Sequence, residues 1–146
     1  MSAVTEQHLA GDLLVAGGGL AGVNCALAAA RLGAKVILVQ DRPVLGGNAS
    51  SEIRMHIVGA TGLHAGVPLV LEPREGGIIE EIRLETTVRN PQRSAAMFDL
   101  QLYELCRAEP NLTLLLNTTV TAARVEAGRI TAVTAERPST EDRFTI

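Results

Sequence analysis

Hydrophobic residues gather in three short runs, at residues 12–16, 35–39 and 112–120. We expect each run to form a buried strand, because continuous apolar segments of this length are typical of parallel sheets covered on both faces. Residues 20–32 are rich in alanine, and their apolar side chains recur at helical spacing: Leu20, Val23, Leu27 and Ala30. This spacing predicts a helix that ends at Gly33. The chain therefore begins with a predicted strand, a glycine turn, a helix and a second strand.

Two more helices are predicted in the middle of the chain. Residues 78–88 have helical spacing, and the helix should end before Pro91 because proline disfavours helical backbone in the residue before it. Ser94 is expected to cap the next helix. The apolar stripe of that helix is Phe98, Leu102, Leu105 and Cys106.

The sequence pattern in the last third of the chain predicts antiparallel strands. Residues 123–127 and 130–135 flank the pair Gly128-Arg129, a pattern that favours a β-hairpin. Residues 143–146 predict the start of another strand. By contrast, residues 41–76 are punctuated by glycine and proline, and we expect a long loop there, of the kind that is usually functional or mobile.

The turn between the first predicted strand and helix has the form G-x-G-x-x-G, with glycines at Gly17, Gly19 and Gly22. In this setting the first glycine permits the tight turn, the second leaves room for a phosphate, and the third lets the helix pack closely on the strand. The free amides at the helix start, at Leu20 and Ala21, attract a pyrophosphate through the helix dipole. The segment predicts a dinucleotide-binding site, and an ordinary strand-to-helix turn is the alternative.

The ribose of such a dinucleotide is expected at the end of the second predicted strand, where an acidic residue is usual. Gln40 occupies that position here. An amide can still exchange hydrogen bonds with ribose hydroxyls, and Asp41, which follows directly, is expected to share the role. Because an amide repels a 2′-phosphate less than a carboxylate does, charge does not exclude NADP. Arg42 is expected over the adenine or near a phosphate, with an ordinary solvated position as the alternative.

The pair Gly46-Gly47 is not part of the simple NAD fingerprint, and a close approach to a cofactor would explain the lack of a Cβ, with an ordinary turn as the alternative. The sequence around it resembles the bacterial FAD dependent oxidoreductases, which have a glutathione-reductase-type Rossmann fold and are related to the fumarate reductase flavoproteins. The likeness covers about residues 12–135. The segments that carry it are residues 41–56, residues 80–83, the helix around Asp99 and Leu102, and residues 114–120.

The resemblance implies an α/β, Rossmann-like domain with a central parallel sheet, helices on both faces and a β-hairpin. It also implies FAD as cofactor and oxidoreductase activity, with hydride or electron transfer performed by the flavin. The pyrophosphate is then expected at Gly17, Gly19, Leu20, Ala21 and Gly22. The adenosine half is expected at Gln40, Asp41 and Arg42. The chain leading to the flavin is expected at Gly46, Gly47 and Asn48.

Two more contacts follow from the resemblance. Ser51 is expected to approach the isoalloxazine or ribityl end of FAD. Val120, placed at the end of the third predicted strand, is expected to pair its backbone with the adenine edge. Members of the family add a later strand and a substrate domain, so residues 1–146 are interpreted as the N-terminal part of an FAD-binding domain. An open sheet edge would favour a complementary polypeptide or self-association.

Composition narrows the class of protein. Aromatic residues are 2% of the 146 residues, so the core must be aliphatic, and the net charge of −3 gives no footprint for nucleic acid. There is no apolar run that would cross a membrane, and residues 1–11 form a polar lead without the features of a signal peptide. We therefore expect a cytoplasmic protein with a small-molecule substrate. Cys25 and Cys106 are expected to be buried on helices in a reducing compartment.

The sequence does not identify a catalytic residue. His56 and His64 follow the glycine pair, and His56 could exchange protons near neutral pH. However, the alternation of Ile53, Met55 and Ile57 favours an ordinary half-buried strand. No cluster with metal-ligand spacing is present in the sequence. Two alternatives to a flavoenzyme stay open, a non-catalytic FAD-binding or assembly subunit and an NAD-dependent dehydrogenase.

Overall fold

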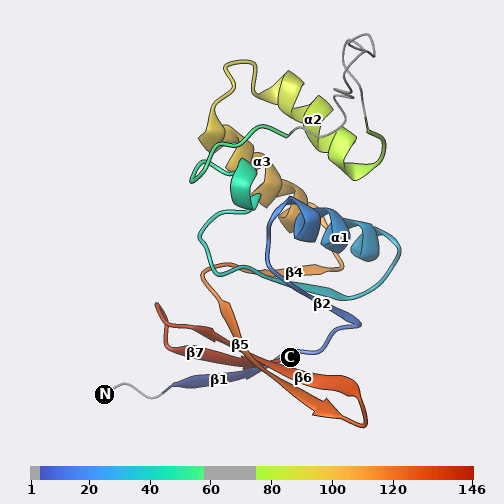
Figure 1. Cartoon of the computed structure of the whole chain (residues 1–146), viewed down its shortest axis with the longest axis vertical. Coiled ribbons are helices and arrows are strands. Elements are labelled where there is room, and N and C mark those ends of the chain that lie inside the picture. The colour runs from blue at the N-terminus through green and yellow to red at the C-terminus, as the bar shows by residue number, and fades with distance from the viewer. Residues whose placement is uncertain (1–3, 58–74) are drawn as a thin grey trace, which may run out of the picture.

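The computed structural model describes residues 4–57 and 75–146 and arranges them in three layers (Figure 1). The helices are α1 (Leu20–Arg31), α2 (Ile78–Arg89) and α3 (Ala95–Ala108), with a short 3-10 helix η1 (Gly47–Ala49). The strands are β1 (Thr5–His8), β2 (Leu13–Ala16), β3 (Val36–Val39), β4 (Leu112–Leu115), β5 (Thr119–Glu126), β6 (Arg129–Arg137) and β7 (Asp142–Thr145). Among the described residues, no helix is both long and apolar enough to span a bilayer.

The central layer is a parallel sheet in the order β2-β3-β4. Leu13 pairs with Val36, and Val36 pairs in turn with Leu112, so the three strands run in register from the same end. All four residues of β3 are buried, as expected for the middle strand of a covered sheet. The predicted parallel sheet is confirmed, and the glycine turn after β2 lies at its carboxyl edge.

Side chains alternate across this sheet and contact different layers. Val36 and Leu38 point to the face on which α1 and α3 pack, where α1 buries Val23 and Leu27 and α3 buries Leu102, each with 0% exposure. The apolar spacing that predicts α1 and α3 therefore builds one core. The predicted cap of α3 is also confirmed, because the Ser94 side chain accepts a hydrogen bond from the backbone N–H of Met97.

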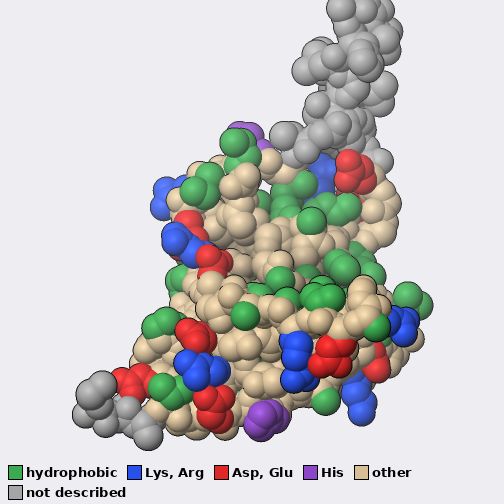
Figure 2. All heavy atoms as spheres, turned by 60° about the horizontal axis from the view of Figure 1, so that its bottom comes forward, with side chains coloured by type: hydrophobic (Ala, Val, Ile, Leu, Met, Phe, Trp, Pro, Cys, Tyr) green, Lys and Arg blue, Asp and Glu red, His purple; other side chains and the backbone are tan. Residues whose placement is uncertain are grey.

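The second face of the parallel sheet is covered by a sheet in the order β1-β7-β6-β5. Ile37 and Val39 pack there against Ala135 and Phe144. Helices on both faces were expected, whereas the described helices lie on one face only (Figure 1). The pattern of buried residues could not separate these cases, because apolar strands and apolar helices cover a sheet equally well. On the side shown in Figure 2, acidic and basic side chains are interspersed. In the second sheet, Arg143 pairs with Glu6 and Glu136.

The predicted β-hairpin is confirmed, with β5 and β6 antiparallel. Its turn residues are Ala127 and Gly128, at φ values of 48° and 76°, so the turn lies one residue earlier than the Gly128-Arg129 pair. Two positive φ values are typical of the type I′ turn that matches strand twist.

The third predicted strand is shorter than expected. β4 ends at Leu115, and the backbone then turns through Asn117, whose φ is 53°. Asparagine tolerates this left-handed conformation better than most residues. Val120 therefore lies in β5 of the second sheet, and its assignment to the end of the third strand was wrong.

Three further expectations need correction. The polar lead contains β1, which pairs in parallel with β7, so edge pairing rather than apolar content makes it a strand. Residues 51–57 form no strand, and Ile53 and Met55 are 61% and 57% exposed, so the proposed half-buried strand was wrong. Cys25 is exposed, whereas Cys106 is buried, and burial raises the pKa of the Cys106 thiol to about 12. Cys25 lies on α1 outside the stripe that contacts the sheet.

Candidate functional site

The glycine turn places the start of α1 at the carboxyl end of the parallel sheet. Gly17 has a φ of 109°, and its N–H donates to Val39 O of the neighbouring strand at 2.8 Å. Gly19 is the residue before the helix, and it supplies no side-chain cap. The first turn of α1 itself carries no acidic side chain, so this turn supplies no anion to its free amides or to the positive end of the helix dipole.

The three glycines of the motif have different spatial reasons for lacking a side chain. A Cβ on Gly22 would lie 1.9 Å from Gly17 O, so only glycine lets α1 pack this closely on the turn. A Cβ on Gly19 would meet no atom within 4 Å, and its φ of −63° suits any residue. Packing and backbone strain therefore do not require glycine at position 19. A ligand that approaches the backbone would require it.

The second glycine pair lies directly against this turn. Gly46 N–H donates to Gly18 O at 2.8 Å, and Gly19 and Gly46 form a parallel bridge. A Cβ on Gly47 would come within 3.2 Å of Gly19 Cα. Gly46 has a φ of 102°, which also favours glycine. The structure thus brings the two predicted glycine segments together into one cradle of unsubstituted backbone.

The Gln40 side chain stabilises this cradle through two hydrogen bonds to its backbone. Its side chain is 5% exposed, and its Oε1 accepts a hydrogen bond from Gly18 N–H at 2.7 Å. Its Nε2 donates to Val44 O at 3.2 Å. Both ends of the amide are therefore engaged within the protein, which differs from the predicted role of bonding to ribose hydroxyls. The contact with ribose stays a prediction.

Asp41 and Arg42 are exposed at the edge beyond β3. The Arg42 Nε donates to the two carboxylate oxygens of Glu52 at 3.2 and 3.1 Å, and this contact raises the pKa of Arg42. The pair is solvated, so its contribution to folding is small. The predicted contacts of Asp41 and Arg42 with adenosine stay predictions.

Beyond the cradle, η1 and the turn after it reach toward α3. Ser51 N–H donates to Asp99 Oδ1 at 2.9 Å, and Asp99 is only 9% exposed. Asn48 is exposed, and its carbonyl accepts a hydrogen bond from Met55 N–H at 2.8 Å. No role was predicted for Asp99, although its position next to Phe98 in the apolar stripe of the predicted helix was an available signal. Val120 lies apart from this group, in the other sheet, where it pairs with Ala135.

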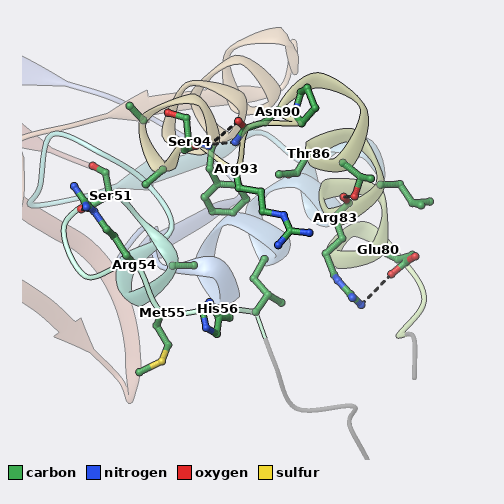
Figure 3. A pocket seen from close by; sticks show the side chains of 18 residues that line it. Ser51, Arg54, Met55, His56, Glu80, Arg83, Thr86, Asn90, Arg93 and Ser94 are labelled. Atoms are coloured by element: carbon green, nitrogen blue, oxygen red, sulfur yellow. Dashed lines mark hydrogen bonds and ion pairs between the residues drawn. The ribbon is translucent and has the colours of Figure 1, made fainter. Parts of the chain in front are cut away.

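A cleft of about 1470 Å³ opens on the far side of η1, between α2, the start of α3 and residues 51–57 (Figure 3). Among the described residues, its charged lining consists of Arg54, Arg83, Arg93 and one carboxylate, Glu80, and His56 also borders it. His56 is exposed in this lining, and His64 lies outside the described residues. The cleft could not be predicted from local sequence pattern, because α2 and the turn before α3 reach it only through the tertiary fold. No group of three or more potential metal ligands occurs in the described part of the chain.

A model of the family described as FAD dependent oxidoreductase matches residues 12–146. The chain belongs to this family. FAD is accordingly the cofactor, and the cradle fits its pyrophosphate, since bare backbone at Gly19 and Gly47 lies beside the uncapped start of α1. The residues that would hold this group are those of the turn at Gly17–Gly22 and the adjoining pair Gly46-Gly47. No curated protein sequence is significantly similar to the chain.

Several solved structures share the fold at low sequence identity. Mycobacterium smegmatis Sdh1 in complex with UQ1 aligns with a TM-score of 0.58 and 13% identity, over 97% of this chain and 32% of that one. The glycerol-3-phosphate dehydrogenase from Bacillus halodurans, complexed with FAD, aligns with a TM-score of 0.56 and 17% identity, over 93% of this chain and 32% of that one. Thermovibrio ammonificans THI4 aligns with a TM-score of 0.55 and 15% identity, over 93% of this chain and 50% of that one. The chain thus spans a third to a half of the length of these proteins.

Proposed function

We propose that this chain is the N-terminal segment of an FAD-dependent oxidoreductase that binds the ADP half of FAD. The observation that carries the proposal is the cradle of bare backbone at Gly19 and Gly47, beside the uncapped start of α1. Family membership supplies the identity of the nucleotide. The simple NAD-dependent alternative does not account for a second glycine pair that lies against the first.

The cradle has the physical properties that a pyrophosphate needs. Two negatively charged phosphates gain from the free N–H groups and the positive dipole end at the start of α1. Their oxygens must approach the backbone closely, and a Cβ at Gly19 would occupy that space. Gln40 and Gly46 fix the cradle in advance through hydrogen bonds to the two sides of Gly18. Such preorganisation lowers the cost of ordering the site when the ligand binds.

The direction of the chain supports a placement for the rest of the cofactor. The adenosine half lies toward Gln40, Asp41 and Arg42, and the ribityl chain and flavin lie toward Asn48 and Ser51. Bound flavin supplies the hydride or electron transfer, and this chain's residues bind and orient it. Asp99 supports that end, since its carboxylate holds the Ser51 amide in place.

The test is a pair of glycine substitutions that the fold tolerates equally. Gly19→Ala and Gly76→Ala each add a methyl group where no atom lies within 4 Å, and neither glycine has a positive φ. FAD binding is measured by quenching of flavin fluorescence, and folding by circular dichroism. We expect Gly19→Ala to weaken FAD binding at least tenfold, about 1.4 kcal/mol, and Gly76→Ala to leave it unchanged. Equal affinity of both variants would refute the assigned cradle.

A further inference from the structure

The cleft beside η1 has two walls that come from distant parts of the sequence. One wall is residues 51–57, which follow the cradle directly, and the other is formed by α2 and the turn into α3 (Figure 3). Ala49 and Ser51 belong to this lining. The cleft therefore begins where the predicted path of the cofactor ends.

Each wall of the cleft carries one arginine whose backbone has a left-handed conformation. Arg54 has a φ of 64° and Arg93 a φ of 56°. Residues other than glycine are uncommon in this region, and those that hold it tend to lie at functional sites. Arg54 is fixed by its N–H, which donates to Ser50 O at 2.8 Å. Both arginines line the cleft.

Buried Asn90 builds the turn that presents Arg93. Asn90 is 4% exposed, its Nδ2 donates to Ser94 O at 2.7 Å, and its Oδ1 accepts from Ser94 N–H at 2.8 Å. Arg93 N–H in turn donates to Asn90 O at 2.9 Å. The guanidinium of Arg93 projects into the cleft (Figure 3) and makes no hydrogen bond or ion pair with any residue in the described ranges. The backbone that carries this cation is thus held in place, while no described residue pairs with its guanidinium.

The remaining charges leave the described lining positive. Arg83 pairs with Glu80 at 3.4 Å, and Glu80 is the one carboxylate among the described residues of the lining. Three arginines against one carboxylate give a formal excess of two positive charges, in a chain whose net charge is −3. A local excess opposite in sign to the whole chain attracts anions.

Apolar side chains occupy the same cleft. Met55 and Leu84 are 57% and 50% exposed, and Ile57 and Phe98 also line it. Concave sites lined by apolar surface with a few placed polar groups are typical of small-molecule sites. We propose that this cleft is a substrate subsite that binds an organic anion, with its carboxylate or phosphate at Arg93 and its apolar body against Met55 and Leu84. The assignment to substrate rests on the proposed flavoenzyme function.

The test uses probes that separate charge from apolar surface. Binding of octanoate, octyl phosphate, octanamide and acetate to the full chain is measured by calorimetry, with and without saturating FAD. We expect octanoate or octyl phosphate to bind more tightly than octanamide, which lacks the charge, and than acetate, which lacks the body. The stronger of the two anions identifies the headgroup. Equal binding of octanoate, octyl phosphate and octanamide, or no saturable binding, would overturn the proposal.

Variants locate the anion. Arg93→Gln should weaken binding of the preferred anion about three- to fivefold, the range of one partly exposed ion pair, and Arg93→Lys should restore part of it. Arg107→Gln is the matched control, because Arg107 is exposed near the other end of α3. No effect of Arg93→Gln would overturn the proposal. If the wild-type chain binds the anion but does not bind FAD, the flavin function is refuted, and the assignment of the anion as substrate is refuted with it.

Discussion

Replacing Gln40 with glutamate tests the interpretation of this residue as the support of the cradle. The two side chains have the same length, and a carboxylate can still accept the hydrogen bond of Gly18 N–H. It cannot donate to Val44 O, which the amide reaches at 3.2 Å. The substitution therefore removes one buried donor and places two acceptors face to face.

The size of the effect follows from burial. Gln40 is 5% exposed, whereas Val44 is half-buried, so solvent replaces the lost partner of Val44 O only in part. Leaving a buried acceptor without its donor costs about 1–3 kcal/mol, and we expect the lower part of that range here. For a chain of this length that corresponds to a fall in the melting temperature of about 2–4 °C per kcal/mol. We expect FAD affinity to fall as well, because Gly18 and Val44 lie on the two strands of backbone that form the cradle.

The effect should depend on pH in a defined direction. Burial beside a carbonyl disfavours the charged form, so the folded-state pKa of the introduced carboxyl should lie above its unfolded value of about 4.3. Below that value the protonated carboxyl can donate to Val44 O, and the deficit should be smallest. The deficit should grow as the pH rises through the folded-state pKa. All other ionisable side chains are the same in both proteins, so the difference from wild type isolates the new group.

The assay is urea unfolding of wild type and Gln40→Glu between pH 4.5 and 7.5, with Gln40→Met as the matched variant that has no titratable group. Gln40→Met should be destabilised by a similar amount at every pH. A Gln40→Glu protein that is as stable as wild type at pH 7.5, or whose deficit does not change with pH, would refute the assigned hydrogen bond to Val44.

Three other predictions follow from single contacts. Gly22→Ala should destabilise the fold by about 1–3 kcal/mol, because its Cβ would lie 1.9 Å from Gly17 O, and urea unfolding that matches wild type would contradict this. Asp99→Ala should weaken FAD binding more than Asp99→Asn, whose side-chain oxygen can still accept from Ser51 N–H, and flavin fluorescence titration measures both. Finally, one thiol should react rapidly with Ellman's reagent at pH 8, and Cys25→Ser should abolish that phase, because burial keeps the Cys106 thiol protonated.

The elements that sequence predicts well are those fixed by local pattern. The apolar runs predict the buried side chains of β2 and β3, and helical spacing predicts those of α1 at Val23 and Leu27. The glycine turn between β2 and α1 is compatible with few other structures. β1 was missed because its residues are polar, and it becomes a strand only by pairing with β7. The end of β4 was missed because one left-handed residue, Asn117, stops an otherwise continuous run.

The candidate site divides in the same way. Gly17 and Gly22 can be predicted from the sequence because the turn and the close packing of α1 require glycine there, whereas the proposed approach of a ligand accounts for Gly19. The direction of the Gln40 side chain cannot be predicted from the sequence, because it depends on where Val44 O lies in the folded loop. The cleft at Arg93 left no signal in the sequence, since it arises from a tertiary contact between segments that no local pattern relates.

The most direct test of the central claim is a competition titration on the wild-type chain. FAD is bound to saturation, and then ADP or riboflavin is added while the release of FAD is followed by fluorescence. If the pyrophosphate and adenosine are held at Gly17–Gly22 and beyond β3, as proposed, ADP should displace FAD and riboflavin at the same concentration should not. Displacement by riboflavin but not by ADP, or no binding of FAD at all, would contradict this claim.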